Sequence, residues 1–541
     1  MKLKKDNTEQ KLRGAYYTPK VLADEIIRLF VTADIASVLE PSCGDGVFLD
    51  SLNDSGLLKQ IKTIDAIEIE QAEAQKVELR YRNSPQVKVL QQDFFDFYKD
   101  YFQQRKYDLI IGNPPYIRYQ YLSESQRKSQ ANILTSHGMK PNKLINAWVA
   151  FTVACIQMLS ERGKIAFVIP AEVLQVAYAE ELRLYLANHL AKITLITFEK
   201  LVFSDIEQEV VVLIGEKDKT EKGIRIIEVK DLEDLKHISL TENDFQPIQH
   251  VKEKWTKYFV NNEEIKLIQT LKNDERFCQF SDVGVINVGI TTGNNDYFSI
   301  DEETTQRYKL QNVSLPLIGR SSHAHGIFFT QQDWELNKSL GKSARLLCFP
   351  DIPYEKYPQS HKDYVKKGEE EQQNLGYKCS IRDRWYIVPS VWSPDAFFLR
   401  RNNLYPKFVL NHCGAVSTDT MHRIKFKANV NALNVLLGYY NSVSFAFTEI
   451  CGRSYGGGVL EILPREMGKI LLPIVNDIDA QLRTELLNKI DEVVRCNQDI
   501  EQALDIVDEE ILVKHLGLKR EICLQCRSIW KKFQNRRLAR G

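Results

Sequence analysis

Apolar positions in residues 1 to about 215 form short runs separated by stretches with helical spacing. Short buried strands that alternate with helices are typical of a largely parallel α/β sheet. We predict helices over residues 146–159 and 180–190. The runs that predict strands are residues 37–40, 63–69, 88–90, 107–111, 164–169, 193–197 and 209–214.

The pattern changes beyond this region. Residues 220–266 are polar and charged, which predicts a connection between domains. From about residue 277, short aromatic and β-branched runs are broken by Gly, Pro and Asn, and residues 477–513 return to helical spacing. A chain of 541 residues exceeds one ordinary core. We therefore predict two domains, 1–245 and 246–541.

The first element has a recognisable helix start. Thr18 offers an N-cap hydroxyl and Pro19 suits the first helical position. Leu22, Ile26 and Phe30 then share one face, so this helix is expected to pack on the core.

Composition adds limits but names no partner. The chain has 43% hydrophobic and 27% charged residues, no apolar run long enough to span a membrane, and no export signal at its start. Ten scattered cysteines then indicate reduced thiols in a cytoplasmic protein. The 72 basic residues balance 72 acidic ones, which is compatible with DNA binding because phosphate contacts need only a local basic face.

The strand at 37–40 runs into a glycine turn, Glu40-Pro41-Ser42-Cys43-Gly44-Asp45-Gly46. Glycines allow positive φ and close approach of a ligand. The third glycine of a dinucleotide fingerprint is absent, and so is a lysine-containing phosphate loop. The pattern favours a nucleoside without phosphates, with a turn that binds no ligand as the alternative.

Acidic residues end or follow three successive strands. Glu40, Glu68 and Asp93 hold these positions, at the sheet edge where open α/β folds bind ligands. Glu68 suits ribose hydroxyls and Asp93 suits an adenine amino group. Each acid could instead cap a helix, but three together favour a site.

The strand at 107–111 leads through Gly112 into Asn113-Pro114-Pro115-Tyr116. Two prolines remove backbone donors and stiffen the turn, which leaves carbonyl groups pointing outward. The Asn113 amide oxygen and the Pro114 carbonyl can both accept from one NH₂ group, and Tyr116 can stack on the base that carries it. Positioning and electrostatics then supply the catalysis. A turn that only ends the strand is the alternative.

In this order, Tyr17-Thr18-Pro19, the glycine turn, Glu68, Asp93 and the tetrapeptide resemble gamma-class S-adenosylmethionine-dependent DNA adenine N6 amino-methyltransferases of restriction-modification systems. The resemblance implies an α/β Rossmann-like methyltransferase domain with a mixed seven-stranded sheet. An irregular α+β target-recognition domain with a helical C-terminal part would follow it. The implied partner is double-stranded DNA, with no membrane, and a separate cognate restriction endonuclease is left open.

The resemblance also implies residue roles. Asn113, Pro114 and Tyr116 would be catalytic, and Tyr116 and Phe203 would sandwich the target base. The cofactor, S-adenosylmethionine, would be bound by Thr18, Glu40, Pro41, Ser42, Gly44, Glu68, Ile69, Asp93, Phe94, Pro115 and Phe151.

Recognition of the DNA is expected in the second domain. Looser similarities lie at residues 289–295, 384–386 and 452–458. The basic side chains that we expect to contact DNA are Arg382, Arg384, Arg400 and Arg401.

Several alternatives stay open. The acceptor could be cytosine N4, structured RNA or a protein glutamine, or the chain could be a non-catalytic DNA-binding subunit. No metal site is expected, because His323 and His325 are interpreted as surface residues and Cys523-x-x-Cys526 has no second pair. Residues 366–371, Lys-Lys-Gly-Glu-Glu-Glu, are interpreted as a solvated loop.

Overall fold

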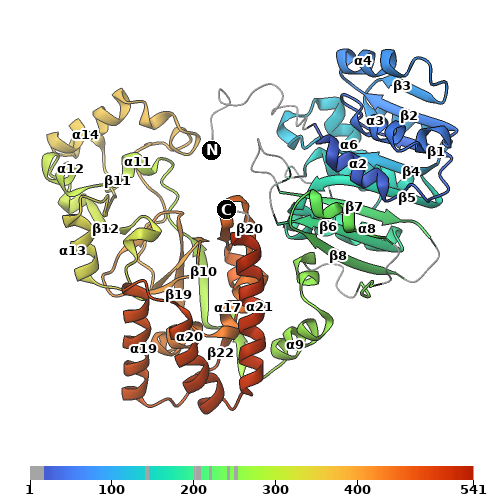
Figure 1. The fold of residues 1–541 in the computed structure, drawn as a ribbon. Helices are drawn as coiled ribbons and strands as arrows, with labels where there is room; N and C mark the ends of the chain where they lie inside the picture. Colours follow the sequence, from blue (N-terminus) through green and yellow to red (C-terminus); the bar gives the residue numbers. More distant parts are fainter. Residues whose placement is uncertain are drawn as a thin grey trace. The chain divides into compact units, whose positions relative to one another are not determined.

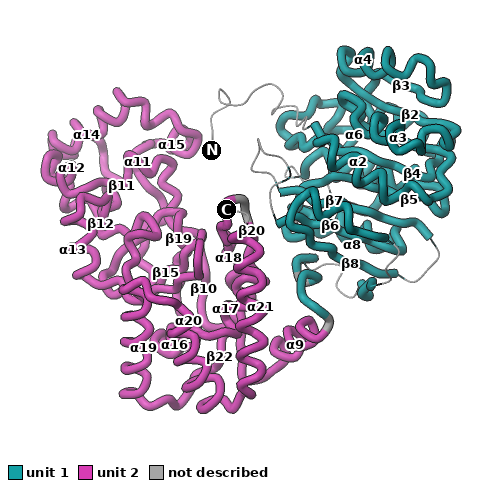
Figure 2. Tube along the Cα trace, in the orientation of Figure 1, with its two compact units in different colours: residues 1–262, 540 teal, residues 263–539, 541 magenta. Residues whose placement is uncertain are grey.

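The computed structural model describes residues 17–140, 145–199, 202, 209–218, 222–240, 244–248 and 254–539. The chain divides into two compact units, with unit 1 ending at Asn262 and unit 2 beginning at Glu263 (Figure 2). The boundary predicted from the sequence, at 245–246, lies 17 residues before this one.

Unit 1 is built on one large sheet with helices on its faces (Figure 1). The strand order is β3-β2-β1-β4-β5-β7-β6-β8. Only β7 runs antiparallel to its neighbours, so the sheet is mixed. The strands are β1 (Ser37–Glu40), β2 (Thr63–Glu68), β3 (Val87–Gln91), β4 (Tyr107–Gly112), β5 (Leu159–Pro170), β6 (Lys192–Phe198), β7 (Val210–Glu216) and β8 (Gly223–Val229).

All seven predicted strands form, but the sheet has eight strands rather than seven. The additional strand, β8, lies within residues 220–266, which were expected to connect the domains. It pairs in parallel with β6. Its Arg225 is buried, and it donates to Thr194 Oγ1 over 2.9 Å and to Asp244 over 2.7 Å. The guanidinium also lies 4.5 Å from the Phe245 ring centroid. A buried arginine, held by the buried Thr194 and the more exposed Asp244, thus lies in a strand whose polar composition predicted a linker.

The helices of unit 1 are α2 (Lys20–Arg28), α3 (Val47–Asp54), α4 (Gln71–Tyr81), α5 (Phe94–Tyr101), α6 (Glu124–Ser136), α7 (Ala147–Gln157) and α8 (Glu180–His189). The predicted cap of the first helix is wrong. Pro19 is the N-cap, with an extended ψ of 134°, and Thr18 makes no capping hydrogen bond. The Pro19 carbonyl accepts from Leu22 N (2.9 Å) and Ala23 N (3.1 Å), so the helix begins one residue later.

Unit 2 has an irregular α+β character, with four small sheets. The five-stranded sheet has the order β10 (Gly284–Val288), β19 (Met421–Phe426), β15 (Ala396–Leu399), β17 (Phe408–Asn411) and β13 (Phe328–Phe329). The four-stranded sheet has the order β11 (Ser299–Ile300), β14 (Arg345–Leu347), β12 (Ser314–Ile318) and β18 (Val416–Ser417). The two smaller sheets are β16 (Arg401–Asn402), β21 (Val459–Glu461) and β20 (Arg453–Tyr455), and the pair β22 (Leu471–Pro473) and β9 (Phe277–Gln279).

Helices surround these sheets and form the C-terminal part (Figure 1). They are α9 (Asn262–Lys272), α10 (Phe280–Val283), α11 (Asn295–Phe298), α12 (Glu302–Arg307), α13 (Gln331–Ser339), α14 (Gln359–Glu370), α15 (Tyr377–Ser380), α16 (Ala432–Tyr439), α17 (Ser442–Cys451), α18 (Pro464–Met467), α19 (Ala480–Arg495), α20 (Glu501–Val507), a π-helix (Asp508–His515) and α21 (Arg520–Leu538).

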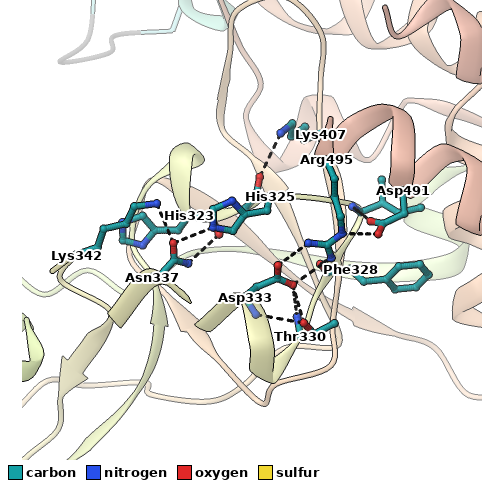
Figure 3. A network of polar contacts seen from close by, with 12 residues as sticks. His323, His325, Phe328, Thr330, Asp333, Asn337, Lys342, Lys407, Asp491 and Arg495 are labelled. Atoms are coloured by element: carbon teal, nitrogen blue, oxygen red, sulfur yellow. Dashed lines mark hydrogen bonds and ion pairs between the residues drawn. The ribbon is translucent and has the colours of Figure 1, made fainter. Parts of the chain in front are cut away.

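Arg495 joins the C-terminal helices to the strand-rich part of unit 2 (Figure 3). Its guanidinium pairs with Asp333 and Asp491, each at 2.5 Å, and donates to the Phe328 carbonyl over 3.0 Å. These hydrogen bonds raise the pKa of Arg495. The network fixes α19 against β13 and α13.

The two histidines near this network are not a surface pair. His323 is buried, its Nδ1 faces the Gly319 N–H at 3.3 Å, and burial lowers its pKa to about 4. A 3-10 turn over Ser321–His323 brings both histidines to Asn337, which lies 3.0 Å from His325 Nε2 and donates to the His323 carbonyl (Figure 3).

Residues 366–371 are also not a loop. Residues 366–370 complete α14, and the charges form i,i+4 pairs, Lys366–Glu370 and Lys367–Glu371, both at 3.7 Å.

Cys523 and Cys526 are buried free thiols on α21. Among the residues described, no helix has the length and apolar character needed to cross a membrane.

Candidate active site

A tight glycine turn links β1 to α3. Gly46, the N-cap of α3, has a φ of +84°, and a Cβ at this position would lie 3.0 Å from a Val77 methyl group. Gly46 N donates to Cys43 O over 2.8 Å, and Cys43 N donates to Ile67 O over 2.9 Å. Glycine is therefore required here both by conformation and by space.

Glu68 ends β2 and braces this turn. Its Oε2 accepts from Gly44 N, and its Oε1 accepts from Glu70 N, both over 2.8 Å. The carboxylate is thus held in one orientation beside the turn, and each oxygen keeps a lone pair for a further donor.

Glu40 ends β1 and is 1% exposed. Its Oε2 accepts no hydrogen bond from any residue that the structure describes. Burial, followed by repulsion from Asp45 and Glu68, raises the pKa of Glu40 well above the ordinary carboxyl value. Burial also raises the pKa of Glu68 and of Asp45.

Three carboxyl groups with raised pKa values surround one turn, and Arg80, which donates to the Asp45 carbonyl over 3.0 Å, offsets only part of the repulsion at Asp45. A cationic ligand would relieve their repulsion and give Glu40 a hydrogen-bond donor. S-adenosylmethionine carries an ammonium group and a sulfonium, so these residues fit that cofactor.

Asp93 follows β3 and caps α5. Its Oδ1 accepts from Phe95 N over 2.7 Å, and its Oδ2 accepts from Gln126 Nε2, also over 2.7 Å. Gln126 lies on α6 and was not identified from the sequence. The Ser123-x-x-Gln126 spacing signals the capping box that forms there, but not the contact with Asp93.

Phe94 and Phe151 come together although they are far apart in sequence. Both are buried, and their rings stack with centroids 4.7 Å apart and planes 26° apart. Phe95 meets Phe151 edge-on at 5.0 Å. Together they form an aromatic wall next to Asp93.

The tetrapeptide meets the glycine turn because β1 and β4 are parallel neighbours, with Leu39 opposite Ile110. Ser42 Oγ donates to the Asn113 carbonyl over 3.3 Å. Tyr116 donates from its hydroxyl to Val168 O over 3.1 Å, which fixes its ring against β5. Pro114 is buried, and Pro115 is half-buried.

Other predicted site residues differ in their surroundings. Thr18 and Pro41 are buried, whereas Ile69 is 51% exposed beside Glu68. Phe203, the predicted second aromatic for the target base, lies outside the described residues.

The predicted DNA-contacting arginines are already engaged within unit 2. Arg400 and Arg401 both pair with Glu461, at 3.0 and 3.5 Å. Arg384 pairs with Asp351 at 2.9 Å. Arg382 donates to the Thr291 carbonyl over 3.0 Å. Arg401 is the most exposed of the four; the others help to hold the local fold.

Comparison with solved structures supports the fold. The chain is similar to the Type IIL restriction-modification enzyme MmeI in complex with DNA, with a TM-score of 0.59, 12% identity, and coverage of 98% of this chain and 80% of MmeI. The expected fold class is thereby confirmed. The chain spans 66% of the type IIG restriction endonuclease BpuSI, at a TM-score of 0.42.

Curated relatives align over much of the chain. The Type II methyltransferase M.AccI of Acinetobacter calcoaceticus is 24% identical over 92% of this chain and 93% of the relative. The Type II methyltransferase M.HindII of Haemophilus influenzae is 26% identical over 67% of this chain and 69% of the relative.

Two family models match. Residues 252–512 match the C-terminal domain of the Type II methyltransferase M.Eco57I. Residues 3–287, more than half of the chain, match the N-6 DNA methylase model. The expected recognition, enzyme class and cofactor, S-adenosylmethionine, are confirmed by this match. The chain belongs to the N-6 DNA methylase family.

Proposed function

We propose that this protein is a site-specific DNA methyltransferase that methylates the N6 amino group of an adenine flipped out of duplex DNA. The observation that carries the proposal is the meeting of the acid-lined turn and the tetrapeptide at neighbouring strand ends. Ser42 joins the two through its hydrogen bond to the Asn113 carbonyl.

The cofactor would lie at the turn. Glu40 is suited to accept from the ammonium group, because its Oε2 is buried and has no partner among the described residues. Glu68 would accept from ribose hydroxyls with its remaining lone pairs, and Asp93 from the adenine amino group. Phe94 and Phe151 would present their ring surfaces to the adenine. When bound, S-adenosylmethionine supplies an electrophilic methyl group.

The target amine would lie at the tetrapeptide. The Asn113 side-chain oxygen and the Pro114 carbonyl would accept its two hydrogens and draw the nitrogen toward tetrahedral geometry. Its lone pair then becomes available as a nucleophile, without a general base before attack. The fixed geometry of two proline residues means that these acceptors need little reorganisation.

Flipping the adenine out of the stack costs a few kcal/mol. Stacking on Tyr116 would offset part of this cost, because base–aromatic stacking contributes roughly 1–3 kcal/mol. The hydrogen bond of Tyr116 to Val168 holds the ring in place before the base arrives. Phe203 is proposed as the aromatic on the opposite face.

Sequence choice would reside in unit 2, whose residues contribute most of the match to the M.Eco57I C-terminal domain. We place the enzyme in a restriction-modification system, where it would protect sites from a separate cognate endonuclease.

Mixed-sequence duplex DNA incubated with the full chain and labelled S-adenosylmethionine tests this function. We expect label in one short sequence context, at adenine. Label at random positions, or transfer only to RNA or protein, would contradict the proposal.

A further inference from the structure

A short segment of unit 2 exposes large apolar side chains to solvent. Leu375, Tyr377 and Ile381 are 65%, 73% and 58% exposed, and Tyr377 is the most exposed large apolar side chain among the described residues. We name residues 372–382 the tip segment. Apolar side chains concentrated in this way on a surface mark a place that another molecule covers.

The tip segment packs closely against residues 289–295. Cys379, within α15, is fully buried, and Gly293 lies against it with a φ of +90°. A Cβ at position 293 would lie 2.9 Å from the Cys379 sulfur. Glycine at 293 therefore allows residues 289–295 to approach α15 closely.

Hydrogen bonds tie both ends of the tip segment to residues 289–295. Arg382 donates to the Thr291 carbonyl over 3.0 Å. Asn294 donates from its side-chain amide to the Gln373 side chain. Cys379 of α15 and Tyr297 of α11 belong to the same hydrophobic core. The exposed side chains thus project from an anchored support.

The chemistry of the tip segment matches DNA. It contains no acidic residue and two basic residues, Lys378 and Arg382, of which Arg382 already donates to the Thr291 carbonyl. Lys378 is exposed, and its ammonium lies 5.7 Å from the Tyr377 ring centroid. Basic residues complement phosphates, while aromatic and aliphatic side chains contact thymine methyl groups or pack between bases. The remaining polar side chains are amides and a hydroxyl, which also hydrogen-bond to base edges.

We propose that the tip segment enters a groove of the DNA duplex, with Tyr377 and Ile381 against the bases and Lys378 beside the phosphate backbone. The proposal rests on the proposed function and specifies which surface of unit 2 contacts the DNA.

The test uses the full chain with Tyr377→Ala and Lys378→Ala. The matched control is Leu524→Ala, which removes an apolar side chain that is 63% exposed on α21. Affinity for DNA is measured by fluorescence anisotropy over a range of salt concentrations. One duplex contains the sequence that the wild-type enzyme methylates, and the other duplex lacks it. S-adenosylmethionine affinity and melting temperature are measured on the same samples.

We expect Tyr377→Ala to weaken binding to the duplex that contains the recognition sequence by about 10-fold. The ratio of its affinities for this duplex and for the duplex without the sequence should therefore fall. Lys378→Ala should weaken binding to both duplexes and lower the slope of log affinity against log salt by about 1. Leu524→Ala should match wild type, and cofactor affinity should stay unchanged in all three.

The proposal is overturned if wild type methylates DNA while Tyr377→Ala and Lys378→Ala bind both duplexes normally; the proposed function then stands. It is also overturned if the variants lose cofactor affinity and melting temperature together with DNA affinity, since the tip segment would then support the fold. Failure of wild type to bind or methylate DNA would instead overturn the proposed function.

Discussion

The side-chain amide of Gln126 donates from Nε2 to Asp93 Oδ2 over 2.7 Å. The other end of the same amide accepts from Ser123 N over 3.1 Å. One side chain thereby connects the start of α6, in the segment that follows the tetrapeptide, to the acid proposed to bind the cofactor adenine.

Gln126→Ala should weaken S-adenosylmethionine binding, because Asp93 loses the partner that orients it. A hydrogen bond to a charged group contributes about 1.5–3 kcal/mol, so we expect affinity to fall by roughly 10- to 150-fold. Ser123→Ala is the control, since it weakens the cap of α6 while keeping the Gln126 amide beside Asp93. Calorimetric titration measures both; equal cofactor affinity in wild type and Gln126→Ala would contradict the coupling.

Glu40 should make stability depend on pH. Its folded-state pKa is raised by burial, so the folded protein retains a proton that the unfolded chain releases. Stability should therefore fall as pH rises from the ordinary carboxyl pKa through the raised folded value. Cofactor affinity should rise over the same window, because an ammonium group prefers the carboxylate form.

Glu40→Gln should remove this part of the pH dependence and weaken cofactor binding. Melting temperature and cofactor affinity are measured from pH 4 upward, in steps of about one unit, to span the ordinary and raised carboxyl pKa values. Asp54→Asn, at an exposed carboxyl group, is the control. A pH profile in Glu40→Gln that is identical to wild type would show that Glu40 does not titrate in this range.

The buried ion pair of Arg537 with Glu449 should dominate the stability of the C-terminal helix. The closest approach is 3.0 Å, and the side chains are 1% and 2% exposed. Arg537→Ala leaves a buried carboxyl group without its partner, so we expect a loss of about 3–5 kcal/mol in unfolding free energy.

Replacing both partners, as in Glu449→Leu with Arg537→Met, should recover most of that loss. Urea unfolding followed by circular dichroism measures the unfolding free energy of wild type, Arg537→Ala and the double variant. If the single and double variants are equally destabilised, packing rather than charge accounts for the effect.

Trp255 should decide whether a truncated fragment of unit 1 keeps its stability. It is fully buried, in a 3-10 helix (Trp255–Phe259) that packs on β8 and on a second 3-10 helix, Ala171–Leu174. A fragment of residues 1–262 should fold and bind the cofactor but lose site selectivity. A fragment of residues 1–245 lacks Trp255 and should be less stable by about 3–5 kcal/mol.

Thermal unfolding of the two fragments, with Trp255→Ala in the full chain for comparison, measures this difference. Equal stability of both fragments would show that Trp255 adds nothing to unit 1. Retained site selectivity in the 1–262 fragment would contradict the role proposed for unit 2.

The catalytic unit could be predicted closely because its strands are apolar and its chemistry follows strand ends. Glu40, Glu68 and Asn113 lie where successive strands finish, so sheet order alone brings them together. Strand β8 escaped prediction because Arg225 is buried through partners that no local pattern shows. The Gln126 contact is likewise set by tertiary packing.

Unit 2 was less predictable. Several of its strands span two or three residues, too short for an alternating pattern, and they pair over long sequence distances. The role of Gly293 also depends on Cys379, which lies far along the chain, so its sequence context gave no sign of the contact.

The most direct test of the central claim compares wild type with Asn113→Ala on the same unmethylated duplex DNA. After incubation with S-adenosylmethionine, the DNA is digested to nucleosides and analysed by mass spectrometry, and cofactor affinity is measured in parallel. We predict N6-methyladenine from wild type, and little or none from a variant that still binds the cofactor. Formation of N4-methylcytosine by wild type, or an equal yield of N6-methyladenine from the variant, would contradict the account.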